Sequence, residues 1–539
     1  MNSSPRIRSQ RYQMIQTVLL SVYSLVLFGM HFIRIFDNSF WGDESYTIQL
    51  VKMNFFRMCF TTAKDVHPPL YYFFTQILYF ILGDHGYTYH LSAVIPYGLL
   101  LLLACTVIRR WFGMIPAVVV ITLSSLTSSA LIYNVEARMY SLGALCVLAA
   151  YLAFYQIYRQ NRVFDWYIFG FTSLCAAYTH YYALISVAFF YLMLLPLWRK
   201  GVAFRKRIIR LYAVTVLSYI VWLYVLYRAF RRTINDGWWL YDIATFSECW
   251  NFLWGFRWLA IIALVFFVCY AGISLLHAHK GTALSNENIL FFAGLLSMIG
   301  TILIGLLLSN LIRPFIVPRY LFPLAPVAYL MLGLCIKDLP WKEVLTALLV
   351  TLVLLWGVPE WLQTYQHERA LDAGTAQALS CITPSQNAFI YTNDSAIGWS
   401  LMGYYFPDIP YDHATTVDEI ASFSGSELWC IWMETPFTDA DRALLSAHHF
   451  SCEEVYSGLF MKDTFTGRFF TDAKEQIFYI YKVTKTTEAL PRFPLSYPVT
   501  MSRKHCRFST RKLPVFCRRW GNLMSYCWST MAPEIAHWT

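Results

Sequence analysis

A pair of adjacent carboxylates stands out in the stretch Trp41-Gly42-Asp43-Glu44-Ser45, which directly follows an apolar run. Charges beside hydrocarbon are costly, so such a pair points to a partner or a chemical task. A carboxylate can deprotonate a hydroxyl, orient a substrate or bind a metal ion. The alternative is a helix cap, in which Asp43 or Glu44 accepts backbone N–H groups at the start of a helix through Thr47.

A second polar stretch follows the first about twenty residues later, with the sequence His67-Pro68-Pro69-Leu70-Tyr71-Tyr72. Its two prolines fix consecutive φ angles and stop any helix before them. Residues 43–67 therefore form an ordered loop region rather than one long helix. We predict one interfacial helix over residues 44–60 and a second interfacial or re-entrant helix over 70–82, which is too short to span a bilayer. The imidazole of His67 could coordinate an ion, bond an acceptor or cap a turn.

The composition excludes a soluble class. Hydrophobic residues make up 57% of the 539 residues and charged residues only 14%, which is typical of a polytopic membrane protein. The net charge of +10 could suggest nucleic acid, but the basic residues cluster in short loops between apolar runs. That pattern indicates membrane topology, and we expect no nucleic-acid partner.

The apolar runs predict about eleven transmembrane helices within residues 1–357. Arg6, Arg8 and Arg11 place the N-terminus inside by the positive-inside rule, so residues 34–87 form the first extracytoplasmic loop. The first run lacks a small-residue cleavage site, and we interpret it as a retained anchor. The runs lie at 14–33, 88–108, 114–132, 139–157, 165–180, 182–198, 211–229, 258–276, 289–309, 319–336 and 342–357.

Under this topology, carboxylates and arginines converge on the outer face. Arg138 and Arg319 each lie at the mouth of a span, where a guanidinium could grip a phosphate or snorkel toward lipid headgroups. Lys64 and Arg313 are weaker candidates for the same task. For Glu136, a salt bridge with Arg138 is the favoured expectation. His180, at the mouth of another span, is comparable to His67.

The sequence becomes polar after residue 357, and we predict a soluble extracytoplasmic α/β domain over residues 358–485. Strands are expected at 388–391, 427–433 and 477–483, and helices at 396–405 and 439–448. No Gly-rich phosphate loop or metal-spaced Cys/His cluster occurs in this stretch of sequence. Residues 486–539 are basic and aperiodic, which is typical of a disordered tail.

Four motifs in this order resemble the GT-C superfamily of glycosyltransferases, in the branch of the protein O-mannosyltransferases and the lipid A aminoarabinose transferases. The resemblance covers about residues 10–357, and the soluble domain matches one that many bacterial members carry. The motifs are Trp41-Gly42-Asp43-Glu44, His67-Pro68-Pro69-Leu70-Tyr71-Tyr72, Glu136-Ala137-Arg138-Met139-Tyr140 and Arg313-Pro314 with Pro318-Arg319-Tyr320.

The resemblance implies a GT-C fold and transfer of a mannose- or aminoarabinose-like sugar from a polyprenyl-phosphate donor. The acceptor would be a protein, lipid A or an envelope glycan, at the outer face of a bacterial inner membrane. It leaves a divalent metal open, with Glu44 and His67 as possible ligands. We expect six further residues to position the acceptor or the substrate: His67, Tyr71, Glu136, Tyr140, His180 and Tyr320.

The chemistry of such a transfer fits the same residues. It needs a base for the acceptor hydroxyl and positive charge on the departing phosphate. Asp43 is our candidate for the base and Glu44 for a supporting role, while the arginines would hold the phosphate. An in-line displacement of this kind inverts the anomeric centre.

Two other classes remain open at this point. A transporter or flippase of lipid-linked sugars would also need many spans and basic residues, but transporters usually place ionisable groups near the bilayer midplane. The predicted spans are almost free of charge, which disfavours transport. A scaffold that binds a partner through its outer domain would not need Asp43, Arg138 and Arg319 to meet.

Overall fold

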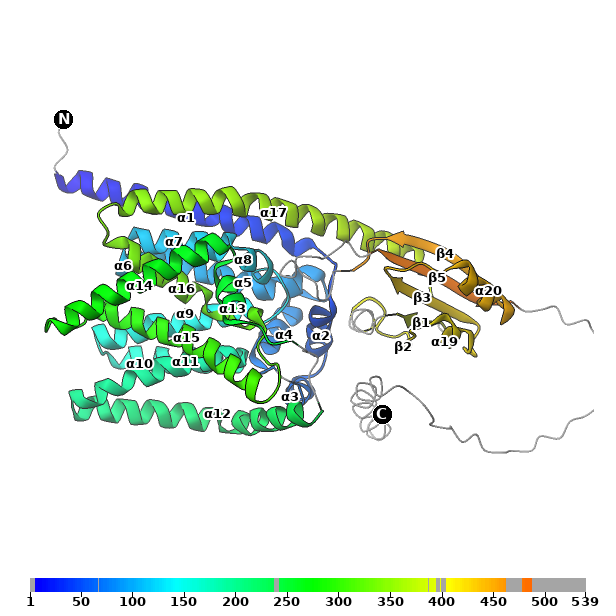
Figure 1. The fold of residues 1–539 in the computed structure, drawn as a ribbon, viewed down its shortest axis with the longest axis horizontal. Helices are drawn as coiled ribbons and strands as arrows, with labels where there is room; N and C mark the ends of the chain where they lie inside the picture. Colours follow the sequence, from blue (N-terminus) through cyan, green and yellow to red (C-terminus); the bar gives the residue numbers. More distant parts are fainter. Residues whose placement is uncertain are drawn as a thin grey trace, which may run out of the picture.

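Helices make up most of residues 5–381, and a mixed β-sheet follows them in a separate part of the computed structural model (Figure 1). The structure describes residues 5–65, 67–236, 242–385, 387–393, 398, 404–461 and 477–486. The helical elements of the first part are α1 (Pro5–Phe32), η1 (Ile33–Phe36), α2 (Gly42–Val51), α3 (Phe55–Ala63), α4 (Leu70–Leu82), α5 (Gly86–Leu103), η2 (Ala104–Ile108), α6 (Arg109–Phe112), α7 (Met114–Leu126), α8 (Ser128–Tyr133), α9 (Tyr140–Arg159), α10 (Val163–Thr179), α11 (Tyr181–Leu194), η3 (Leu195–Lys200), α12 (Val202–Asp236), α13 (Phe246–Trp254), α14 (Arg257–His279), α15 (Asn286–Leu311), η4 (Pro318–Leu324), α16 (Ala325–Lys337) and α17 (Lys342–Cys381).

Nine helical segments of the described chain are long and apolar enough to cross a membrane, and each coincides with a predicted span. The other two predicted spans fall on α7 and α10, which have 13 and 17 residues. The polytopic α-helical class is therefore confirmed. The nine segments are 13–36, 86–112, 140–159, 181–200, 202–232, 257–279, 286–311, 318–337 and 342–381.

Burial separates central from peripheral helices. The most apolar stretch of the α16 segment is 94% buried and that of α9 is 83% buried, whereas the corresponding figure for α12 is 22%. Helices that are apolar all round belong in the middle of a bundle. On α12, large apolar side chains such as Leu217 and Val221 are exposed, as expected of a face that meets lipid.

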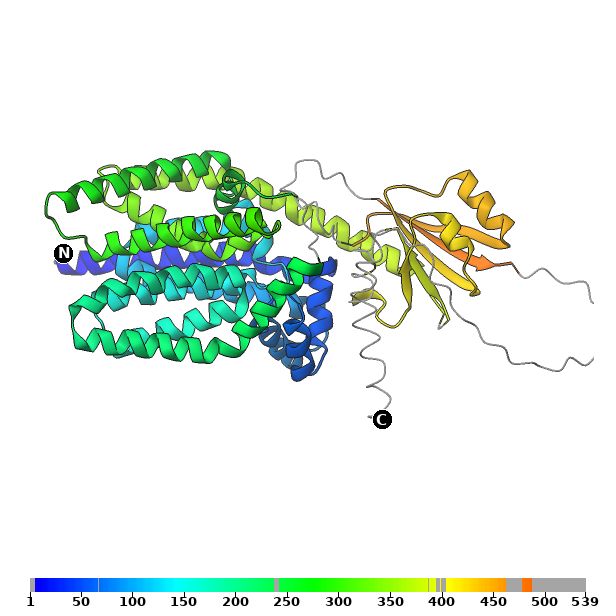
Figure 2. The same ribbon diagram turned by 60° about the horizontal axis from the view of Figure 1, so that its bottom comes forward.

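The elements between the first and second long helices lie at one end of the bundle, on the side of the sheet (Figures 1 and 2). The single helix predicted over 44–60 is wrong: α2 ends at Val51 and α3 begins at Phe55. The reason is the side chain of Asn54, which accepts the backbone N–H of Arg57 at 2.9 Å and so starts a new helix. The short helix expected over 70–82 is confirmed as α4, directly after Pro69.

The second part is a five-stranded sheet in the order β2-β1-β3-β5-β4, with apolar clusters on both faces. β1 pairs in parallel with β2 and β3, while β5 pairs antiparallel with β3 and β4. The α/β character of this part is confirmed. Its elements are β1 (Phe389–Thr392), β2 (Tyr411–His413), α19 (Val417–Ala421), β3 (Glu427–Met433), α20 (Asp439–Ala447), β4 (Phe450–Gly458) and β5 (Phe478–Lys485).

Most predicted elements of the sheet part are present, since β1, β3, β5 and α20 fall where the sequence places them. The edge strands β2 and β4 are not among the predictions. In β4, apolar and polar residues alternate only weakly, and two glutamates, Glu453 and Glu454, are adjacent. An edge strand faces water and tolerates such residues, so its sequence gives a weak strand signal. Most of the helix predicted at 396–405 and residues 487–539 of the predicted tail lie outside the described residues.

One helix joins the two parts. α17 has 40 residues and runs without interruption through the boundary predicted at residue 357 (Figure 1). Its Glu368 forms a buried, bidentate ion pair with Arg34, at 2.6 and 2.7 Å. Tyr405 reaches the same segment, where its hydroxyl accepts the backbone N–H of Phe40 at 2.8 Å and donates to the carbonyl of Asn38 at 3.1 Å. The segment that precedes α2 is thus held by residues that lie more than 300 positions later in the sequence, Glu368 and Tyr405.

Candidate active site

Asp43 lies in the first turn of α2, and its carboxylate faces two guanidinium groups. Oδ2 of Asp43 is 3.6 Å from Nη2 of Arg138 and 3.4 Å from Nη2 of Arg319. Arg138 comes from the loop between α8 and α9, and Arg319 from η4. The fold therefore brings together three charged residues that lie far apart in the sequence.

The two arginines differ in their surroundings. Arg138 is buried, and its Nη1 donates to the carbonyl of Asp43 at 3.0 Å and to the hydroxyl of Thr47 at 3.4 Å. Burial opposes its charge, but the neighbouring Asp43 carboxylate holds the pKa of Arg138 well above its ordinary value. The guanidinium of Arg319 lies 5.4 Å from the ring of Trp41, a cation–π contact.

Four polar atoms near this centre are buried and have no hydrogen-bond partner within the described chain. Buried polar atoms without partners are rare, and each calls for an explanation. A ligand placed against the arginines would supply partners for those that face it. The atoms are Nε of Arg138, Nε of Arg319, the hydroxyl of Tyr72 and Oε1 of Glu136.

Glu136 does not form the expected ion pair with Arg138. In the described structure the guanidinium of Arg138 turns to Asp43, while Glu136 keeps one oxygen without a partner. Burial, followed by the negative charge of Glu44, raises the pKa of Glu136 to about 8. A raised pKa favours the protonated form of Glu136, which weakens any ion pair with Arg138.

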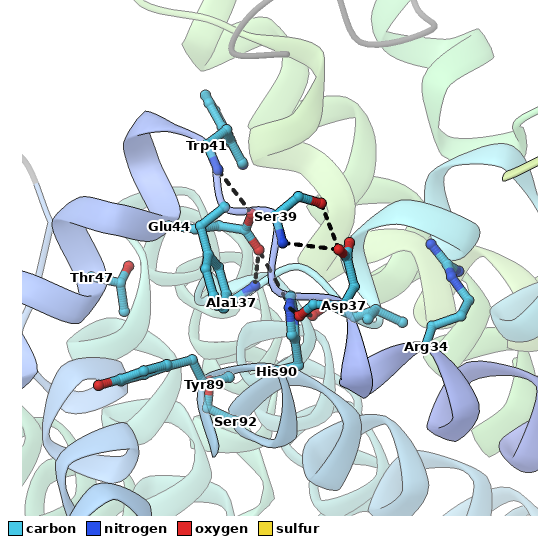
Figure 3. Close-up of polar contacts among 12 residues, drawn as sticks. Arg34, Asp37, Ser39, Trp41, Glu44, Thr47, Tyr89, His90, Ser92 and Ala137 are labelled. Carbon is cyan, nitrogen blue, oxygen red and sulfur yellow. Dashed lines mark hydrogen bonds and ion pairs between the residues drawn. The ribbon is translucent and has the colours of Figure 1, made fainter. Parts of the chain in front are cut away.

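The fully buried side chain of Glu44 caps the start of α2 and links it to the loop of Ala137 (Figure 3). Its Oε2 accepts the backbone N–H of Trp41 at 3.4 Å, and its Oε1 accepts that of Ala137 at 2.8 Å. The capping alternative for the carboxylate pair therefore applies to Glu44, while Asp43 faces the arginines. Oε1 of Glu44 also lies 3.9 Å from Nδ1 of His90, a residue that the sequence interpretation missed.

His67 and His180 are brought together, with ring centroids 6.1 Å apart. Nδ1 of His67 lies 3.3 Å from Oδ2 of Asp65. His180 accepts the backbone N–H of Tyr182 at 3.1 Å, and its ring lies 5.1 Å from that of Tyr320. Together with Tyr140, whose ring is 5.9 Å from His180, these side chains form an aromatic border next to Arg319.

Three candidates lie outside this group in the described structure. The hydroxyl of Tyr71 forms a hydrogen bond with that of Ser92 at 2.5 Å, and no hydrogen bond in the described structure joins it to the arginines. No ion pair or hydrogen bond recorded for the described residues joins the side chain of Lys64 or of Arg313 to Asp43, and Lys64 is exposed at the end of α3. Neighbouring Tyr72, rather than Tyr71, points a free hydroxyl toward the centre.

A metal site built on Glu44 and His67 does not fit these residues. Both oxygens of Glu44 face backbone N–H groups, and Nδ1 of His67 faces a carboxylate. Within the described ranges, no group of three or more His, Cys, Asp or Glu side chains is arranged to hold an ion.

No protein-family model matches the chain. No curated protein matches it either. Among solved structures, the chain is similar to ArnT from Cupriavidus metallidurans in the apo state, at 13% identity and a TM-score of 0.48 over 86% of this chain and 97% of that one. It is likewise similar to ArnT from the same organism bound to undecaprenyl phosphate, at 14% identity and a TM-score of 0.49 over 86% and 97% of the two chains. These identities are too low to transfer a function.

Proposed function

We propose that this chain is a membrane glycosyltransferase that moves a sugar from a polyprenyl-phosphate donor to an acceptor hydroxyl. The observation that carries the proposal is the Asp43 carboxylate held between Arg138 and Arg319. A carboxylate and two guanidinium groups supply the base and the phosphate charge that this reaction needs. The motif resemblance to GT-C enzymes supports the same assignment.

The arginines would bind the donor phosphate. Two guanidinium groups against one carboxylate leave a net positive charge, and each arginine keeps a buried Nε–H without a partner. Arginine binds phosphate oxygens through such paired donors. An incoming phosphate would replace Asp43 as the partner of Arg138 and Arg319, and the released carboxylate would then be free to act as a base.

The transfer step balances with these residues. Asp43 takes the proton from the acceptor hydroxyl as that oxygen forms a bond to the anomeric carbon of the sugar. The bond from this carbon to the phosphate oxygen breaks, and its electron pair leaves with the phosphate. Arg138 and Arg319 stabilise the added negative charge on polyprenyl phosphate. A single displacement inverts the anomeric centre.

An apolar cavity suits the lipid part of the donor. It has a volume of about 320 Å³ and is lined entirely by apolar surface from α3, α4 and α10. Its lining includes Pro69, two residues after His67, and Tyr178, two residues before His180. An isoprenoid chain would pack there against Phe73 and Leu174.

Sidedness follows from the basic loops. Arg6, Arg8 and Arg11 favour an N-terminus inside, which puts α2, the arginines and the sheet domain on the extracytoplasmic side. We propose a bacterial inner membrane as the location. Mannose- and aminoarabinose-like sugars, and protein, lipid A or envelope-glycan acceptors, all remain within the proposal.

The two competing classes find less support. The scaffold hypothesis does not need Asp43, Arg138 and Arg319 to lie together, yet they do. A transporter would need charge along its path through the bilayer, whereas α2, the helix of Asp43 and Glu44, lies at one end of the bundle (Figure 1).

The test is transfer by the purified protein in nanodiscs. A panel of radiolabelled polyprenyl-phosphate sugars is offered with envelope extract as acceptor, and wild type is compared with Asp43→Asn. Label that moves into a new product with wild type alone supports the proposal and identifies the donor. No transfer from any donor, together with label crossing the bilayer of proteoliposomes, would instead establish a transporter.

A further inference from the structure

Tyr71 and Tyr72 are adjacent in the first turn of α4, and their hydroxyl groups differ in one respect. Both side chains are fully buried. The hydroxyl of Tyr71 forms a hydrogen bond with that of Ser92 at 2.5 Å, whereas the hydroxyl of Tyr72 has no hydrogen-bond partner within the described residues. A buried hydroxyl without a partner costs free energy, so that of Tyr72 calls for an explanation.

The face of α4 that carries Tyr72 packs against α2. One turn after Tyr72, Nε2 of Gln76 donates to the carbonyl oxygens of Val51 and Met53, at and just after the end of α2. Residues four positions apart on a helix share a face. Burial raises the pKa of Tyr72 and the charge of Arg138 lowers it, with a raised pKa as the result. The hydroxyl therefore keeps its proton, beside one arginine of the charged centre.

Two carboxylates also lie close enough to act on Tyr72 through their charge, but other donors occupy both. Oδ2 of Asp65 lies 3.3 Å from Nδ1 of His67, and the hydroxyl of Tyr46 also bonds this carboxylate. Asp43 faces the two guanidinium groups. The described part of the chain thus gives the hydroxyl no acceptor, and a ligand oxygen can take that place.

The chemistry of the site selects the kind of ligand. The hydroxyl of Tyr72 and Nε of Arg138 are both buried donors without an acceptor in the described structure. A guanidinium group has donors and a positive charge but no acceptor. A ligand that satisfies both groups must therefore offer several acceptor oxygens and a negative charge. Phosphate meets these conditions, whereas a sugar hydroxyl is uncharged.

We propose that Tyr72 is a further phosphate-binding residue, whose hydroxyl donates a hydrogen bond to an oxygen of the donor phosphate beside Arg138. The inference rests on the proposed glycosyltransferase function and adds a neutral donor to its two arginines. In the free protein the unpartnered hydroxyl lowers stability, and in the complex it adds a contact. One group thus has opposite effects on the stability of the free protein and on phosphate affinity.

Tyr72→Phe tests both effects, because it removes the hydroxyl and keeps the ring. Without ligand, the variant is expected to unfold at a temperature equal to or above that of wild type, since no hydrogen bond is lost. Its affinity for polyprenyl phosphate, measured by titration calorimetry in nanodiscs, is expected to fall about 10- to 150-fold, the usual contribution of a hydrogen bond to a charged group.

The matched control is Tyr71→Phe, which makes the same change at the neighbouring position. It removes a hydroxyl that is bonded to Ser92, so it is expected to unfold at a lower temperature than wild type. Its affinity for polyprenyl phosphate is expected to equal that of wild type. The two variants should therefore exchange order between the melting experiment and the binding experiment.

Two results would overturn the proposal. Unchanged phosphate affinity in Tyr72→Phe would mean that a buried water satisfies the hydroxyl. Weaker binding together with a lower unfolding temperature would mean that the hydroxyl serves the fold. Binding of polyprenyl phosphate needs no sugar transfer, so the two hypotheses can fail separately. If no donor is turned over and phosphate binding still depends on Tyr72, the glycosyltransferase function fails and the phosphate contact stands.

Discussion

Replacing Asp43 with asparagine separates catalysis from binding, because the carboxylate serves two purposes in the proposed reaction. Without a general base the transfer rate is expected to fall by a factor of about 10² to 10⁴, the usual contribution of such a group. The side chain keeps its size, so the fold of α2 is expected to persist. Activity is measured as label transfer from the donor identified by the panel experiment.

Binding is expected to move in the opposite direction. In the resting protein Asp43 competes with phosphate for Arg138 and Arg319, from 3.6 and 3.4 Å. A phosphate that shared these guanidinium groups would lie about 6 Å from the carboxylate, and Coulomb's law gives about 0.7 to 2.8 kcal/mol of repulsion per charge at a dielectric of about 80 to 20. Asp43→Asn is thus expected to bind polyprenyl phosphate about threefold to a hundredfold more tightly.

The matched control is Asp84→Asn, which removes a carboxylate that is paired with Lys52 rather than with the arginines. It is expected to change neither transfer nor binding. Titration calorimetry in nanodiscs measures the affinity of each variant. Turnover of Asp43→Asn within threefold of wild type would refute Asp43 as the base, and weaker phosphate binding would refute the competition between carboxylate and phosphate.

Four further outcomes are expected. Arg319→Ala removes a charge-assisted donor and should weaken polyprenyl phosphate binding about 10- to 150-fold by calorimetry, with no change if the arginine only snorkels. Glu136 has a pKa raised from 4.5 to about 8, so the folded state binds more protons in that range and stability should fall as the pH rises from about 4.5 to 8; Glu136→Gln should abolish this fall in thermal melts. Glu368→Gln leaves Arg34 buried without its partner and should cost about 3–5 kcal/mol in unfolding experiments, a loss that a second change, Arg34→Met, should partly reverse. Leu174→Trp fills the apolar cavity and should reduce transfer from an undecaprenyl donor more than from a farnesyl donor, whereas equal effects would place the lipid chain elsewhere.

The charged centre could be predicted in part, because residue type and membrane topology are readable along the chain. Asp43, Arg138 and Arg319 follow or precede apolar runs on one predicted face, and the fold brings these three together. The orientation of each side chain is not readable in this way. Glu44 is adjacent to Asp43 and chemically similar, yet the helical turn directs it into the protein.

His90 could not be singled out from the sequence for a related reason. It lies inside an apolar run, where a single histidine gives no pattern, and its partners are main-chain carbonyls that any residue type provides. The break between α2 and α3 falls in Val51-Lys52-Met53-Asn54-Phe55, where a polar residue can continue an amphipathic helix as well as end one. Only the cap formed by Asn54 ends one helix and starts the next.

The ion pair between Arg34 and Glu368 has a consequence for biosynthesis. The partners are separated by 334 positions, so the ribosome makes Arg34 long before the residue that neutralises it. Until α17 has been synthesised and inserted, the guanidinium must stay in water or at the lipid headgroups, since an unpaired charge is costly to bury. The segment leading to Asp43 therefore takes its final place late, and a nascent chain arrested before residue 368 should display an unformed catalytic centre.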